Sequence, residues 1–132
     1  MARADPAEQA LIRLELRRFT TRCDSQERMI ERADSLRELS RLASLAVPSR
    51  LFSETPARDA QRMVLLAAEN RAKSLIGEHI NAWLKAEPEF REKHRSRMDD
   101  EWASLTGPLG HLRPWALRQL TTAEQNQMNP GN

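Results

Sequence analysis

Arginine is the residue type in this 132-residue sequence that is best suited to binding chemistry, with 18 copies against 3 of lysine. A guanidinium makes forked contacts with phosphate and carboxylate groups that an ammonium cannot make. The arginines recur in pairs four residues apart, and a helix would place the members of a pair about 5–6 Å apart on one face. That geometry could grip neighbouring phosphates along a nucleic-acid strand. A GC-rich coding bias would also explain the excess of arginine, without any binding role.

Two stretches concentrate these cations and are the predicted binding sites. Residues 13–22 carry four arginines against one acid, Glu15. Elsewhere, many cations follow an acid by four residues, the favourable order on a helix, which indicates a solvated surface that neutralises itself. These pairs are Asp24–Arg28, Glu54–Arg58, Glu69–Lys73, Glu87–Arg91 and Glu89–Lys93. We predict that a polyanion or an acidic partner binds at Arg13, Arg17, Arg18 and Arg22, and in second place at Arg91, Lys93, Arg95 and Arg97.

Groups suited to catalysis or metal binding are sparse. The histidines lack the close spacing that zinc ligands need, and we interpret His79 as a core residue bonded to a neighbour. Cys23 has no evident base beside it, so we expect it to pack as a small buried hydrophobe. The acids of residues 99–101 would splay around a helix. We expect no catalysis, metal or cofactor; the alternative left open is an enzyme site that joins His79, His94 and acids.

Composition favours an all-α protein. Leu and Ala occur 17 times each, whereas Val and Ile together occur 6 times and Tyr is absent. Strands favour β-branched and aromatic residues, and helices favour Ala, Leu, Arg and Glu. The length suggests one domain over residues 1–132. The formal net charge of +2 lacks the strong basic footprint of a dedicated DNA binder.

The sequence predicts an irregular bundle of four to six helices that begins with a long N-terminal helix or a helical hairpin over residues 6–46. Asp5, Pro6 and Glu8 make a capping box at its start. Two apolar stripes at helical spacing follow. They are Ala7, Leu11, Leu14 and Ile12, Leu16, Phe19, Cys23.

The N-terminal segment offers more than one place for a helix break. A second capping box, over residues 24–27, predicts one helix at 6–22 and another at 25–46. Ser35 with Glu38 offers a third capping box. Read as one continuous helix, the segment would span about 60 Å and need a partner, such as another copy of itself.

A C-terminal helical core is expected over residues 56–120. The stretch from 56 to about 86 is the most periodic and predicts a central buried helix. Residues 47–54 form the connector before this helix, and Leu51 and Phe52 within it are expected to anchor against the core. A narrower stripe from Phe90 to Leu105 predicts the next helix, which ends before Gly107.

The end of the chain is expected to be a short helix followed by a tail. Pro114 opens the helix, and residues 126–132 form a polar tail. The tryptophans are expected to meet in one core cluster. They are Trp83, Trp102 and Trp115.

Function is expected to lie in binding. The first hypothesis is a small non-catalytic helical subunit or adaptor that docks on a larger protein or nucleoprotein assembly, or on itself, through arginine-rich helix faces. The alternative is an autonomous DNA- or RNA-binding regulator that contacts the phosphate backbone through arginine pairs. The longest apolar run, residues 63–68, is far short of the ~20 residues of a membrane span, and no export signal is evident. We therefore expect a cytoplasmic protein with no membrane partner.

Overall fold

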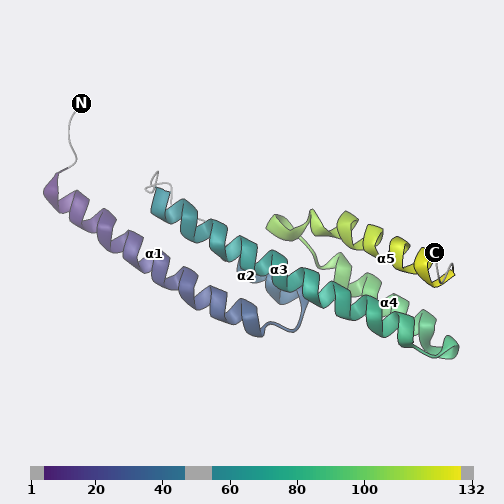
Figure 1. Cartoon of the computed structure of the whole chain (residues 1–132). Helices are drawn as coiled ribbons and strands as arrows, with labels where there is room; N and C mark the ends of the chain where they lie inside the picture. Colours follow the sequence, from purple (N-terminus) through teal and green to yellow (C-terminus); the bar gives the residue numbers. More distant parts are fainter. Residues whose placement is uncertain (1–4, 47–54, 129–132) are drawn as a thin grey trace.

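The computed structural model describes residues 5–46 and 55–128, which form five α-helices and two short 3₁₀ turns (Figure 1). The helices are α1 (Pro6–Arg32), α2 (Leu36–Leu45), α3 (Thr55–Lys85), α4 (Arg91–Ala103) and α5 (Leu112–Met128). The turns are η1 (Pro88–Phe90) and η2 (Gly107–Leu109). The described residues contain no strand, so the predicted all-α bundle with a long first helix is confirmed. The expected anchors Leu51 and Phe52 lie outside the described residues.

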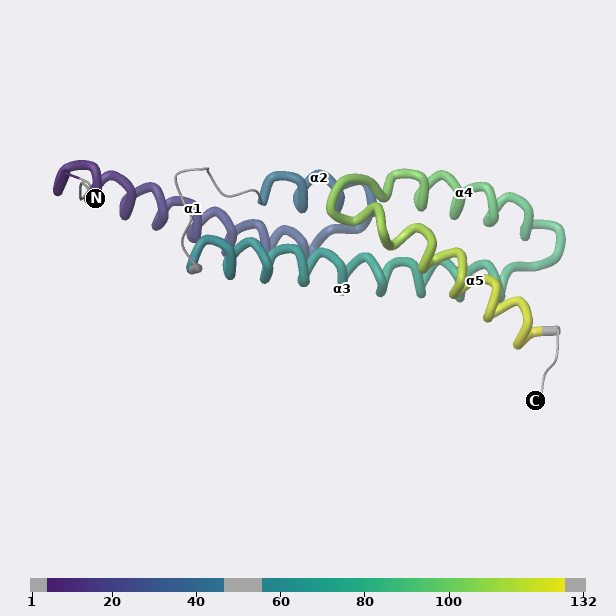
Figure 2. The backbone as a smooth tube through the Cα atoms, turned by 90° about the horizontal axis from the view of Figure 1, so that it is seen from above, coloured from purple at the N-terminus to yellow at the C-terminus, as the bar shows by residue number. Residues whose placement is uncertain are grey.

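Helix α3 is the centre of the bundle and contacts each of the other four α-helices. Along it, α1 runs in the same direction beside the first half, and α2 returns in the opposite direction (Figure 2). Helices α4 and α5 cover the second half. Val64, Ala68, Ala72 and Ile76 are fully buried, so the central helix expected from residue 56 to about 86 is present.

The predicted break near residue 24 is wrong, because α1 continues through this region and ends at Arg32. Cys23 is buried on the same face as Phe19 and Ile30, so a break there would remove its side chain from the core. The chain turns instead at residues 33–35. There the Ser35 Oγ accepts a hydrogen bond from the N–H of Glu38 at 3.2 Å, so the third capping box starts the second helix.

Tertiary contacts hold this corner between α1 and α2. The Arg71 Nε donates to the carbonyl of Ala33 at 3.1 Å, across 38 positions of the chain. The N–H of Leu36 donates to a carboxylate oxygen of Glu101 at 3.5 Å, across 65 positions. Because both partners are distant in sequence, the local pattern could not indicate which capping box would be used.

The C-terminal half departs from the predictions in four details. Phe90, at the start of the predicted stripe, is 50% exposed. Helix α5 begins before Pro114, which stands in its first turn, where the missing N–H breaks no helical bond. The same helix reaches Met128 and so includes the start of the predicted polar tail. Trp102 is buried in the core, whereas Trp83 and Trp115 are only partly buried and pack against its rim.

Candidate binding site on the first helix

The first turns of α1 extend past the neighbouring helices α2 and α3. The hydrogen bond from Arg71 to Ala33 places these two residues side by side on the parallel helices α3 and α1. Counted back by the same number of residues along each helix, the first residue of α3, Thr55, lies level with about residue 17 of α1. The last residue of α2, Leu45, lines a small groove with Phe19 and so reaches no further. The first turns of α1 therefore extend beyond both helices, as Figures 1 and 2 show.

This projecting segment contains no buried residue before Phe19. We call residues 6–18 the arm. Ile12 and Leu16 are partly buried and pack against the end of the core. The other apolar stripe points outward, and Leu11 and Leu14 are 58% and 43% exposed. A helix that overhangs its own core and keeps large apolar side chains in water presents a surface suited to another molecule.

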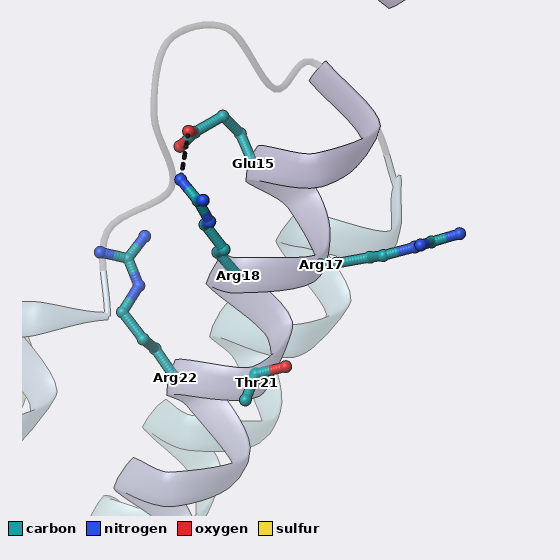
Figure 3. Close-up of a pocket in the computed structure, with 5 residues that line it drawn as sticks. All are labelled: Glu15, Arg17, Arg18, Thr21 and Arg22. Atoms are coloured by element: carbon teal, nitrogen blue, oxygen red, sulfur yellow. Dashed lines mark hydrogen bonds and ion pairs between the residues drawn. The ribbon is translucent and has the colours of Figure 1, made fainter. Parts of the chain in front are cut away.

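The four arginines of the first predicted site are all exposed, but they do not converge on one point. At 3.6 residues per turn, Arg13 and Arg17 share one flank of α1, and Arg18 and Arg22 share another, roughly 140° away around the axis. Figure 3 shows Arg17 pointing away from Arg18 and Arg22. The site is therefore two pairs of cations on either side of an outward helix face.

Charge within this site is only partly compensated. Arg18 Nη1 lies 3.4 Å from a carboxylate oxygen of Glu15, and both side chains are substantially exposed, which makes the ion pair weak. Among the described residues, Arg13, Arg17 and Arg22 have no ion pair. An open depression of about 520 Å³ lies along this part of the helix, lined by Glu15, Arg17, Arg18, Thr21 and Arg22 (Figure 3).

The second predicted site contains two arginines that pack between helices, which we call the buttressing arginines, and two exposed cations. Arg91 donates from Nη2 to the carbonyl of Leu84 at 3.3 Å, and its guanidinium lies 5.5 Å from the Trp83 ring centre. Arg95 lies over the same ring at 5.9 Å and binds Glu124 of α5 at 3.0 Å. These two arginines join α4 to α3 and α5.

Lys93 and Arg97 are exposed and are the members of the second site that remain available to a partner. The sequence did not reveal this division, because the partners of the two buttressing arginines are an aromatic ring, a carbonyl and an acid 29 residues away. Of the i, i+4 pairs expected from the sequence, Glu69 and Lys73 have charged atoms 3.3 Å apart. Three other expected pairs form no ion pair among the described residues; they are Asp24–Arg28, Glu87–Arg91 and Glu89–Lys93.

His79 is half-buried and bonded to a neighbour, as the sequence predicted. Its Nδ1 lies 3.3 Å from the Nε1 of Trp102, whose N–H can only donate. Burial lowers the pKa of His79, and the nearby carboxylates of Glu101 and Glu78 oppose this effect. In the neutral ring the proton therefore sits on Nε2, so neither nitrogen has a free lone pair for proton abstraction or metal binding.

A pocket of about 480 Å³ does bring together the groups of the enzyme alternative. It is lined by Asp34, His79, Ala82, His94, Arg97, Met98, Asp100 and Glu101. Glu101 also binds the N–H of Leu36, and its role there is to close the α1–α2 corner. With His79 fixed by Trp102, the pocket contains no evident pairing of a base with a nucleophile.

Cys23 is 2% exposed. Burial, followed by the charges of Asp24 and Glu27, raises the pKa of its thiol, and Arg22 opposes the shift. The thiol is therefore protonated at neutral pH and packs as the expected small hydrophobe.

Over the described ranges, 5–46 and 55–128, no group of three or more His, Cys, Asp or Glu residues is placed to hold a metal ion. No helix in that part of the chain is long and apolar enough to cross a bilayer. Comparison with protein-family models, with curated proteins and with solved structures finds no match for this chain.

Proposed function

We propose that this chain is a small, non-catalytic helical adaptor of the cytoplasm that docks on an acidic surface of a larger protein assembly through the arm of α1. The observation that carries the proposal is the arm itself, which leads past α2 and α3 and bears exposed Arg13, Arg17 and Arg18, with Arg22 exposed one turn further along the same helix. Three of these four cations have no ion pair among the described residues. Carboxylates of a partner would supply one, in the forked geometry that arginine favours.

The apolar side chains of the arm favour a protein over a nucleic acid as the partner. Leu14 lies on the outward face between the two arginine pairs, and Leu11 lies on the flank that Arg18 and Arg22 share. A phosphate backbone offers nothing apolar to cover these leucines, whereas a protein surface can bury them between charged contacts. The formal net charge of +2 also gives little general attraction to a polyanion.

A charge-reversal variant with a matched control tests the adaptor function. The arm variant changes Arg13, Arg17, Arg18 and Arg22 to Glu. The control changes four exposed arginines away from the arm to Glu, so that the net charge falls equally; these are Arg37, Arg41, Arg113 and Arg118. In each of these proteins, expressed in the native cell, a photo-crosslinking amino acid in place of Leu14 would then identify the molecule that covers the arm.

We expect crosslinks from residue 14 to one recurring protein in the parent and in the control, and their loss in the arm variant. Crosslinks that survive equally in the arm variant would refute the choice of site. The nucleic-acid alternative has its own signature: purified chain would retain labelled single- or double-stranded oligonucleotides and release them steeply as salt rises. Such binding, lost in the arm variant and kept in the control, would replace the adaptor hypothesis.

A further inference from the structure

The contact between His79 of α3 and Trp102 of α4 joins two helices through a hydrogen bond that one proton can abolish. The indole Nε1 donates to the imidazole Nδ1 at 3.3 Å. Trp102 is 2% exposed, so its N–H has no ready access to water as a substitute partner. His79 is more accessible, because it lines the 480 Å³ pocket described above.

We propose that His79 and Trp102 form a proton-sensitive joint, in which protonation of His79 releases Trp102 and loosens α4 from α3. A neutral imidazole has one acceptor nitrogen, and Trp102 occupies it. The imidazolium ion has donors at both nitrogens, so Nδ1–H and the indole N–H would face each other as two donors. The bond cannot survive that change without movement of one ring. This inference does not depend on the proposed adaptor function.

The charges around the joint decide where the released imidazolium goes. Glu78 of α3 and Glu101 of α4 attract a proton to His79, and burial of the ring works against them more strongly. The other charged or titratable groups that line the pocket are Asp34, from the α1–α2 corner, and His94, Arg97 and Asp100, from α4. A charged ring that leaves Trp102 therefore has carboxylates within the same pocket to receive it.

The direction of the pH effect follows from the folded-state preference for neutral His79. The pKa of His79 in the folded chain lies below the ordinary value of about 6.5 that applies when the chain is unfolded. As the pH falls below about 6.5, the unfolded chain takes up this proton first, and the folded state loses stability. The loss ends once the pH is below the lowered pKa of the folded chain.

Unfolding by urea between pH 7.5 and pH 5 tests the joint. His79→Gln keeps an acceptor oxygen for Trp102 but has no proton to gain, and His94→Gln, in the same pocket, is the matched control. We expect the unfolding constant of the parent and of His94→Gln to rise severalfold more on acidification than that of His79→Gln. Equal pH profiles for the parent and His79→Gln would overturn the proposal.

Nitrogen NMR of the histidines gives a second readout that does not require the variant to fold. We expect His79 of the parent at pH 7.5 to be in the Nε2–H form, and we expect its pKa to lie below the ordinary histidine value of about 6.5. We also expect the Trp102 indole N–H signal to shift with the same midpoint. Two results would exclude the joint: an Nδ1–H form of His79, or a Trp102 indole signal that does not shift as His79 is protonated.

Discussion

The start of α2 offers the sharpest test of the local structure, because the sequence contains two competing capping boxes and the fold uses one. The Ser35 Oγ accepts a hydrogen bond from Glu38 N–H at 3.2 Å, and the residue has extended backbone angles, as an N-cap requires. Ser35→Ala removes this acceptor. We expect a loss of about 1 kcal/mol in the free energy of unfolding.

Asp24→Ala is the matched change in the box that the fold does not use. Asp24 lies inside α1 and is exposed, so alanine brings higher helix propensity and removes at most a weak surface charge pair. We expect its free energy of unfolding to stay within about 0.5 kcal/mol of the parent or to rise. Urea unfolding followed by circular dichroism separates the two variants. If Asp24→Ala costs as much as Ser35→Ala, α1 is broken near residue 24 and the described corner is wrong.

Two further pairs of variants probe the bundle by the same unfolding assay. Arg95→Ala should cost about 0.5–1 kcal/mol, since it removes the 3.0 Å contact with Glu124 and the contact with the Trp83 ring, whereas exposed Lys93→Ala should change little; equal effects would contradict the buttressing role. Gly107→Ala should cost about 1–2 kcal/mol, because its φ is +56°. Gly77→Ala, where an added Cβ meets nothing within 4 Å, should stabilise the helix by about 0.5–1 kcal/mol, and a loss there would reveal a contact that the structure lacks.

The sequence predicted those features of the fold that depend on local spacing. The long periodic stretch from residue 56 became α3 because its apolar side chains repeat at helical intervals over almost its whole length. The turn at Gly107, which follows the end of α4 at Ala103, was also expected from residue type, since a positive φ is easy only for glycine. Features settled by distant partners were not predictable in this way. The corner at residues 33–35 depends on Arg71 and Glu101, which local pattern cannot bring near.

The candidate site shows the same division. Its four arginines could be selected from the sequence, because a shortage of neighbouring acids is a local property. Leu11 and Leu14 were visible only as one of two apolar stripes on the same helix, and nothing local indicates which stripe faces the core. From the sequence, Arg91 and Arg95 were predicted to be available for binding. Both guanidinium groups lie over the Trp83 ring, and a tertiary contact of this kind leaves no trace in the local sequence.

The shared direction of α1 and α3 has an electrostatic consequence. Each helix has a partial positive charge at its N-terminus, from backbone N–H groups that lack an intrahelical acceptor. Both N-termini lie at the same end of the molecule, which is also the end that carries the exposed guanidinium groups of Arg13, Arg17 and Arg18. The side chain of Asp5 accepts a hydrogen bond from Ala7 N–H at the start of α1, and the antiparallel α2 ends beside Phe19, so an acid and a helix C-terminus partly offset the positive charge there.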